Sequence, residues 1–489
     1  MFKLPRRGGP VRSRPCLSGH FKAPGEDYIQ NWILAVGLDQ MAGQGQLPFN
    51  DNSHLRIFAR RADPKIPTRC ESEARLMTAC KRYFKANPKP VPVRSPNEPA
   101  CSNLTLVGDI LSLEPSERTV LSFMATLCED SAFHSFAACA GTYAMAQAHT
   151  LVAYATGLTE MEVRRALSPK GRLLSSGLVV VNECSSSLDD RFSIKRGLGD
   201  LLSLPDLTRA AFVQHFLPEA KPTELVASDF SHMQNEVATA RALLGAAVKR
   251  AQPGVNVLFF GPTGTGKSAL ASLLAAELKV RLHTAGTADA EGDAATPMER
   301  LGSLLLGQRL FGGGQGLLLF DELEDLFQSD FPSMFGGMRR QRGVMSKVWF
   351  NLLLEDNPAP TIWISNSVDG VDPAFLRRFA YVVEFKPAGP RERERVLARH
   401  AADTDLSAED ISQIARRYDT NPAQIATAVS AARLIAASGR PDRAALEQVM
   451  SPMERLLNGG VSPHREDFDA GAFRLDGVKD KADLTVLAD

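Results

Sequence analysis

Short apolar runs alternate with helical stretches between residues 229 and 385. The five runs read VNVLFF, VRLHT, GLLLF, TIWIS and YVVEF. Short apolar strands that are separated by helices are typical of a mainly parallel sheet with helices on both faces. The pattern predicts a doubly wound α/β domain over residues 229–385.

From Gly389 onward the apolar positions recur at helical spacing only. Four stretches have this periodicity: PRERERVLARHA, SAEDISQIARRY, NPAQIATAVSAARLIAAS and DRAALEQVMSPMERLL. They predict a small helical lid over residues 386–457. Residues 458–489 read as an acidic, irregular tail. Because this tail ends inside a helical pattern, we expect the chain to continue.

Residues 106–205 predict a mostly helical, winged-helix-like domain, followed by a linker over residues 206–228. The segment 151–202 reads as helix, turn, helix and two strands around a Ser/Asp-rich turn, an order typical of a winged helix. A helix that reads DNA has a basic outer face, whereas residues 160–167 hold two glutamates and two arginines. The balanced charge favours a structural or protein-contacting winged helix over a DNA reader.

The chain has no net charge, but its charges are unevenly distributed. Residues 1–105 hold 17 Lys and Arg against 8 Asp and Glu, and the remainder holds 39 against 48. The first 25 residues contain prolines and glycines that break the amphipathic helix of a transit peptide. We expect residues 1–105 to be basic, irregular and partly disordered, with short helices such as 72–85. Such an arm contacts nucleic acid or an acidic partner in some proteins and nothing specific in most.

Residues 131–159 contain no charged side chain except histidine. The histidines, Gln147 and repeated Ser and Thr make this segment a poor membrane span, and they favour buried helices. The seven cysteines are odd in number and include no C-x-x-C pair, as expected of free thiols in a reducing cytoplasm. We therefore expect a cytoplasmic protein without a membrane anchor.

The strand VNVLFF is followed by GPTGTGKS and a helical stretch. This G-x-x-x-x-G-K-S spacing is a P-loop, whose backbone N–H groups surround phosphates while Lys267 bridges the outer phosphates and Ser268 binds Mg²⁺. The sequence therefore predicts an ATP site with Mg²⁺. The expected nucleotide-binding residues of the loop are Gly261, Pro262, Thr263, Gly264, Thr265, Gly266, Lys267 and Ser268.

Acidic and polar residues follow two later strands. GLLLF ends on Asp321 and Glu322, and we expect Asp321 to hold Mg²⁺ and Glu322 to act as the catalytic base. Asn366 follows TIWIS, where its amide can orient the attacking water or contact the outer phosphate. Arg377 and Arg378 follow DPAFL; adjacent arginines are usually surface charge, but in a ring they can reach a neighbouring subunit's nucleotide.

The ordered set of P-loop, LLLFDE, Asn366, DPAFLRRF and four-helix lid resembles the classical AAA family of ATPases over about residues 229–455. The resemblance implies a homo-oligomeric ring, expected to be a hexamer, with ATP between subunits and with Arg377 and Arg378 as arginine fingers acting in trans. The lid has Ala423 where wider branches keep a sensor arginine. The winged-helix-like segment before a single ATPase module is similar to that of a group of bacterial AAA proteins.

Two loops bear on what such a ring grips. The segment 284–301 contains the loop where AAA unfoldases carry an aromatic step, but it has no aromatic residue and three acids, Asp289, Glu291 and Asp293. A second loop, residues 327–347, carries Phe331, Phe335 and three arginines, and reads equally well as a gripping element and as a solvated insertion. The acidic loop argues against a processive unfoldase unless the alignment is off by a few residues.

Two functions follow from these patterns. The leading one is an ATPase that remodels an unknown protein client, which the N-terminal half selects. The alternative is a nucleotide-controlled binding module or switch that engages nucleic acid or a signalling partner. The sequence contains no H-E-x-x-H motif, so a fused zinc protease is not expected.

Overall fold

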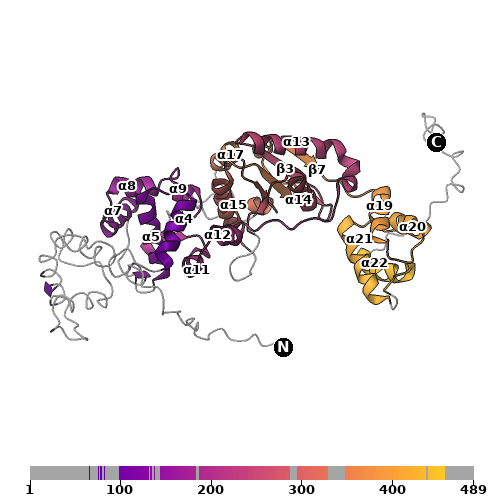
Figure 1. The fold of residues 1–489 in the computed structure, drawn as a ribbon, viewed down its shortest axis with the longest axis horizontal. Helices are drawn as coiled ribbons and strands as arrows, with labels where there is room; N and C mark the ends of the chain where they lie inside the picture. The colour runs from indigo at the N-terminus through magenta and orange to yellow at the C-terminus, as the bar shows by residue number, and fades with distance from the viewer. Residues whose placement is uncertain are drawn as a thin grey trace, which may run out of the picture. The chain divides into compact units, whose positions relative to one another are not determined.

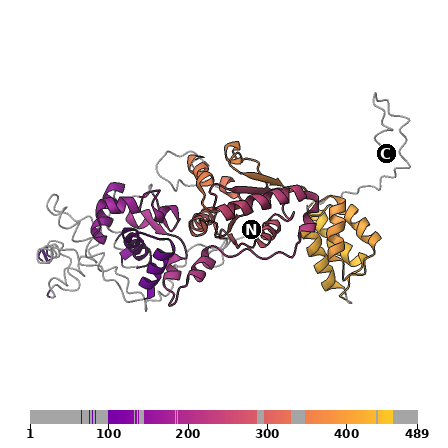
Figure 2. The ribbon, with the colours of Figure 1, turned by 45° about the horizontal axis from the view of Figure 1, so that its top comes forward.

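The computed structural model describes most of the chain between residues 99 and 457 (Figures 1 and 2). Within that range the gaps are 131–132, 135–136, 138–143, 183–184, 186, 287–294, 329–346 and 437–438; before it, only Lys65, Arg75, Thr78, Ala79 and Arg82 are described. The expected helix at 72–85 lies largely outside the described residues, and the acidic tail lies entirely outside them. Two compact units divide the chain: Met1–Phe260 with Ser268–Val383, and Gly261–Lys267 with Glu384–Asp489.

The first unit is built on a sheet whose strands coincide with the five apolar runs. Its order is β4-β5-β6-β3-β7. β3 pairs with β6, β5 with β6 and β4 with β5, all in parallel. The strands are β3 Asn256–Phe260, β4 Leu282–Thr284, β5 Leu317–Phe320, β6 Thr361–Ser365 and β7 Tyr381–Glu384. The chain passes from β3 near the middle of the sheet to β4 at its edge, and then returns through β5 and β6. Parallel strands in this order need crossover helices between them. The predicted α/β fold class is therefore confirmed.

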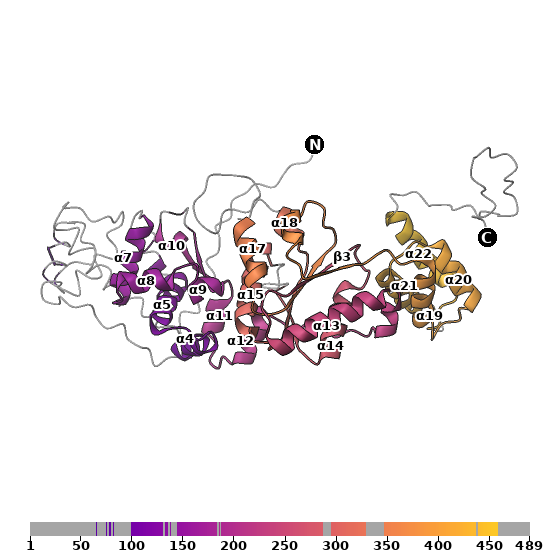
Figure 3. The same ribbon diagram turned by 90° about the horizontal axis from the view of Figure 1, so that it is seen from above.

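Helices flank this sheet. Figure 3 shows α13 and α14 together on one side of it, with α15 and α17 away from them. The central strands are buried along their whole length, which is why they read as continuous apolar runs and not as alternating ones. The helices are η1 Ala227–Met233, α13 Gln234–Arg250, α14 Lys267–Leu278, α15 Pro297–Phe311, α16 Asp325–Gln328, α17 Lys347–Asp356 and α18 Pro373–Leu376.

The helical region before the sheet, which we call the N-terminal region, covers Pro99–Phe216. Its helices are α4 Pro99–Ile110, α5 Pro115–Glu129, α7 Met145–Thr156, α8 Glu160–Ala166, α9 Arg172–Ser175, α10 Leu188–Arg191, α11 Leu198–Leu202 and α12 Arg209–Phe216. The strands β1 Val179–Val181 and β2 Phe192–Ile194 pair antiparallel. The expected helix, turn, helix and two paired strands are present, with the short helices α9 before the first strand and α10 between the strands. The assignment as a winged helix stays a prediction.

The expected linker over residues 206–228 differs from the structure in two respects. It contains α12, whose Phe212 and Phe216 are buried. The segment after α12 then joins the outer edge of the sheet: the Thr284 N–H donates to the Pro218 carbonyl at 2.9 Å, and the Ala220 N–H donates to the Leu282 carbonyl at 2.8 Å. This extended segment thus covers the edge that β4 would otherwise expose.

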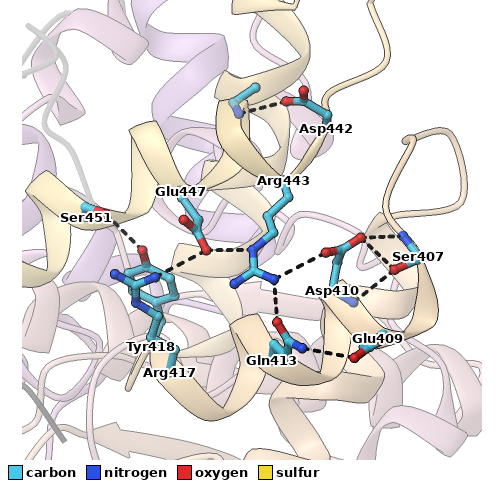
Figure 4. A network of polar contacts seen from close by, with 11 residues as sticks. Ser407, Glu409, Asp410, Gln413, Arg417, Tyr418, Asp442, Arg443, Glu447 and Ser451 are labelled. Atoms are coloured by element: carbon cyan, nitrogen blue, oxygen red, sulfur yellow. Dashed lines mark hydrogen bonds and ion pairs between the residues drawn. The ribbon is translucent and has the colours of Figure 1, made fainter. Parts of the chain in front are cut away.

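The second unit contains the four expected lid helices, α19 Pro390–His400, α20 Ala408–Arg417, α21 Pro422–Ile435 and α22 Arg443–Leu457. Arg443 joins α20 to α22, with Nε 2.9 Å from Glu447 Oε1 and Nη1 3.4 Å from Asp410 Oδ1 (Figure 4). Buried Tyr418 crosses the same interface and contacts Ser451 Oγ at 2.9 Å. Among the described residues of the chain, no helix is both long and apolar enough to cross a membrane.

Candidate nucleotide-binding site

The glycine-rich loop follows β3 and ends where α14 begins at Lys267. Gly261, Gly264 and Gly266 have φ values of 139°, 74° and 93°, which residues other than glycine rarely adopt. A Cβ at Gly261 would lie 2.0 Å from the carbonyl oxygen of Phe385. Backbone packing therefore requires glycine here, and the loop keeps the open shape in which N–H groups can surround phosphates.

Lys267 is held by the loop itself. Its side chain is buried, and Nζ donates to the carbonyl oxygens of Gly261 at 2.5 Å and of Pro262 at 2.8 Å. Thr265 Oγ1 also donates to the Pro262 carbonyl, at 2.8 Å. These contacts hold the ammonium group beside the loop, where a positive charge suits the phosphates of ATP.

The lid contacts this loop through Asn421, a residue that the sequence analysis did not identify. Asn421 caps α21, and its Nδ2 donates to the Thr263 carbonyl at 3.1 Å. The side chain also lies against Gly264, where an added Cβ would be 2.6 Å from the amide atoms. Ala423 contributes its backbone N–H to Gly264, at 3.4 Å. The signal in the sequence was the N-cap pattern of Asn421 before Pro422.

The two predicted magnesium ligands are brought together. Ser268 follows Lys267 in the first turn of α14, Asp321 follows β5, and Ser268 Oγ donates to Asp321 Oδ2 at 3.3 Å. A hydroxyl and a carboxylate oxygen are the donor types that Mg²⁺ takes beside a bound phosphate. The pair therefore fits a Mg²⁺ ion that accompanies ATP.

Glu322 is exposed, and it has a left-handed backbone with φ 54°. Such a conformation is strained for a residue with a Cβ and is found most often at functional sites. Its carboxylate contacts Arg300 of α15, with Nη1 of the arginine 3.0 Å from Oε2. The sequence pattern places Arg300 in the loop segment 284–301, but α15 begins at Pro297 and includes Arg300 in a helix.

Asn366 directly follows β6, as predicted. Its amide contacts the carboxylate of Glu324, an acid other than the expected base Glu322. Its Nδ2 donates to Glu324 Oε1 at 2.8 Å, and its backbone N–H donates to the same carboxylate at 3.2 Å. Ser365 Oγ donates to the other oxygen of Glu324 at 2.7 Å. Glu324 therefore fixes the orientation of Asn366, a role that its place in DELED did not reveal.

The adjacent arginines have unequal surroundings. Arg378 forms an ion pair within the chain, with its Nε 2.6 Å from Glu355 Oε1. Arg377 is exposed at the end of α18, with no side-chain hydrogen bond or ion pair to any residue that the structure describes. Of the two arginines, Arg377 is therefore the more exposed to solvent.

Two buried basic groups lie where the N-terminal region contacts the sheet. Burial lowers the pKa of Lys195 to about 8, while its Nζ donates to the Glu299 carbonyl at 3.1 Å. His283 of β4 stacks on Phe311 with ring centroids 4.2 Å apart. Burial also lowers the His283 pKa, and its Nδ1 lies 2.9 Å from the Leu217 carbonyl oxygen. The three acids of the first candidate loop lie within residues 287–294, and Phe331, Phe335 and the three arginines of the second lie within residues 329–346; both stretches are outside the described part.

A parallel sheet with a glycine-rich loop after β3, and with acids after β5, defines a P-loop nucleoside triphosphatase domain. Residues 257–387 match the family model "ATPase family associated with various cellular activities (AAA)". The resemblance to AAA ATPases drawn from the sequence is thereby confirmed for the ATPase module, whereas the winged-helix-like segment before it stays a prediction.

Curated relatives share this part of the chain. The ATP-dependent zinc metalloprotease FtsH 1 of Symbiobacterium thermophilum is 28% identical over 239 residues, which are 47% of this chain and 39% of that protein. A putative 26S proteasome regulatory subunit homolog of Methanothermobacter marburgensis is 29% identical over 176 residues, which are 33% of this chain and 44% of that protein. The chain thus spans less than half the length of either relative.

Among solved structures, a mutant of Thermotoga maritima RuvB aligns with 47% of this chain and 72% of its own chain. The sequence identity is 16% and the TM-score is 0.35. A likeness at this level adds nothing to the family assignment.

Proposed function

We propose that this protein is a Mg²⁺-dependent ATPase that assembles into a homo-oligomeric ring and remodels a protein partner or complex. The observation that carries the proposal is the 3.3 Å contact between Ser268 Oγ and Asp321 Oδ2, which joins the P-loop helix to the acid after β5. The P-loop motif and the acidic motif after β5 are 53 residues apart at this contact, and a site for a nucleotide and a metal ion requires them to lie together. The relatives named above are an ATP-dependent protease and a proteasome subunit homolog, which supports action on proteins.

Each residue of the site has a role in this proposal. The loop glycines and Lys267 bind the ATP phosphates, and Ser268 and Asp321 hold the Mg²⁺, which neutralises charge on the phosphates when it is bound. Glu322 accepts the proton of the attacking water, and Asn366 orients that water. Arg377 stabilises the charge that develops on the nucleotide of a neighbouring subunit, and Arg378 supports it from within its own subunit.

The N-terminal region is the proposed site of client recognition. On α8 the charged side chains are paired: Arg164 lies 2.7 Å from Glu160, and Arg165 lies 3.3 Å from Glu114. Met161 is 74% exposed on the same helix. A surface with compensated charges and an exposed apolar residue suits a protein partner better than a phosphate backbone, which needs uncompensated positive charge.

The alternative function is a nucleotide-controlled switch that binds nucleic acid or a signalling partner. The basic composition of residues 1–105 favours it. The two functions differ in turnover, because a remodelling enzyme hydrolyses ATP faster with its client, whereas a switch hydrolyses slowly whatever is added.

The test uses two variants of the full chain. Glu322→Gln should bind ATP, lose hydrolysis by a factor on the order of 100 or more, and remain assembled with ATP; the readouts are phosphate release, nucleotide affinity and mass in solution. Lys267→Ala should lose ATP affinity instead. Proteins captured by the Glu322→Gln ring are then added to the wild type. Normal turnover in Glu322→Gln would refute the base assignment, and turnover that no captured protein raises would favour the switch.

A further inference from the structure

Arg300 is a buried cation, and the hydrogen-bond acceptors that it has among the described residues lie in the acidic segment after β5. Nη1 donates to the Asp321 carbonyl and to Glu322 Oε2, each at 3.0 Å, and Nη2 donates to Asp325 Oδ2 at 2.8 Å. The Arg300 side chain is 7% exposed, against 59% for Glu322. A buried guanidinium needs such partners, because an unpaired buried charge is strongly unfavourable. Arg300 therefore restrains Glu322 more than Glu322 restrains Arg300.

This contact occupies a carboxylate oxygen of the proposed catalytic base. A base must turn a free oxygen toward the attacking water within hydrogen-bond reach. The ion pair holds Oε2 toward α15, and the left-handed backbone of Glu322 fixes the direction in which its side chain leaves the strand. Arg300 Nε is buried without an acceptor among the described residues, an unfavourable state that a movement of α15 can relieve.

The first turn of α15 also receives the N-terminal region. Lys195 Nζ donates to the Glu299 carbonyl at 3.1 Å, and Arg196 Nη1 lies 3.6 Å from Glu299 Oε1. Lys195 is buried at this contact. Gly177 packs so closely that an added Cβ would lie 2.9 Å from the Gly302 carbonyl. Glu299 and Arg300 are consecutive residues of this turn. Glu299 contacts the N-terminal region, and Arg300 contacts Glu322, the proposed base.

The segment after α12 adds a second attachment, on the strand before this helix. It pairs with β4 through the Pro218 carbonyl and the Ala220 N–H. The N-terminal region is thus joined to both the strand and the helix that border residues 285–296. These two attachments give a shift of this region a direct path to β4 and α15.

We propose that Arg300 is a positioning residue that restrains Glu322, and that the N-terminal region sets this restraint through Lys195 and Arg196. The inference rests on the proposed function, in which Glu322 is the base and the N-terminal region recognises the client. Engagement of a client protein shifts α15, loosens the contact between Arg300 and Glu322 and raises the rate of hydrolysis. A coupling between sites of this kind typically changes a rate or an affinity by about 5-fold to 150-fold.

The test compares steady-state ATP hydrolysis in variants of the full chain. Lys195→Met with Arg196→Ala should raise kcat at least about fivefold and leave KM for ATP unchanged, because neither residue touches the loop. Arg300→Gln should raise kcat similarly. Combining all three substitutions should give no further increase, since both routes release the same carboxylate. Arg300→Lys keeps a buried cation and should restore part of the restraint.

Arg309→Gln is the matched control, since Arg309 is exposed on the last turn of the same helix; it should leave kcat unchanged. A fall in kcat for Arg300→Gln would overturn the inference. So would an increase in kcat from the Lys195 and Arg196 substitutions that is the same in the wild type and in the Arg300→Gln variant. If Arg300→Gln does not fold, as a melting curve would show, the Lys195 and Arg196 variant decides alone: unchanged kcat refutes the coupling. Glu322→Gln is assayed in parallel, because normal turnover there would refute the proposed function instead.

Discussion

The phosphate-binding loop and the acidic segment after β5 serve the same proposed reaction but are held in different ways. In the loop, Lys267 contacts carbonyls only five and six residues away. In the acidic segment, Glu322 is held by Arg300 across 22 residues, and Glu324 holds Asn366 across 42. Lys267 is thus held by its own loop, which the lid also contacts through Asn421 and Ala423, whereas Glu322 and Asn366 are held by side chains of other elements of the first unit.

This difference suggests how control is divided. The loop is held by its own carbonyls and by the lid, so a movement of α15 need not alter how it binds a nucleotide. Acids that depend on side chains of α15 and of the strand ends respond to any movement of those elements. We therefore expect binding of ATP to be constant and its hydrolysis to be adjustable.

The largest expected effect is on kcat, and it should differ between the adjacent residues Arg377 and Arg378 because their contacts differ. Arg377→Ala should lower kcat about 1000-fold, the order of an arginine finger, because Arg377 is exposed and has no partner within the described residues. Arg378→Ala should cost much less, since Arg378 is already bound to Glu355 at 2.6 Å. Phosphate release measures both variants.

Mixing tests the direction in which Arg377 acts. Rings that combine Arg377→Ala and Lys267→Ala subunits should recover part of the activity, because each variant supplies what the other lacks at a shared interface. No recovery at any ratio would contradict a finger that acts in trans.

The next effect concerns stability and pH. Burial lowers the pKa of Lys195 from 10.5 to about 8, so between these values the unfolded chain binds more protons than the folded one. Stability then rises with pH across this window, by up to about 3 kcal/mol. In denaturant titrations from pH 7.5 to 10.5, the wild type should gain stability relative to Lys195→Met. A constant difference between the two would show that Lys195 keeps its ordinary pKa.

The glycine-rich loop offers a perturbation that leaves the acidic segment intact. Gly261→Ala forces a Cβ to within 2.0 Å of the Phe385 carbonyl at φ 139°, and strain of about 2 kcal/mol would weaken ATP binding roughly thirtyfold. Gly389→Ala is the control, because a Cβ there meets nothing within 4 Å. Equal ATP affinities in the two variants, measured by calorimetry, would mean that the loop is less dependent on its backbone than the structure indicates.

The same division explains what could be predicted from the sequence. The five strands and the four lid helices were found because hydrophobic periodicity is a local signal. Helix α12 was missed, since eight residues with two buried phenylalanines lie between polar and proline-containing segments. Arg300 and Glu324 were missed for another reason. Their partners are 22 and 42 residues away, and a charged residue in the sequence does not reveal which distant group it will meet.

The smallest of these effects tests the acidic segment directly. Glu324→Gln replaces a carboxylate oxygen by an N–H₂ group opposite the donors of Ser365 and Asn366, so the Asn366 amide should lose its fixed orientation. We expect kcat to fall about tenfold, or about 1.4 kcal/mol, with the ATP affinity unchanged. Asp369→Asn is the matched control, because Asp369 is exposed and its side chain accepts from Ser367 Oγ at 2.8 Å. If both variants hydrolyse ATP at the wild-type rate, Asn366 does not depend on Glu324. If Glu324→Gln alone is slow, the hydrolytic groups are positioned by tertiary contacts that leave nucleotide binding untouched.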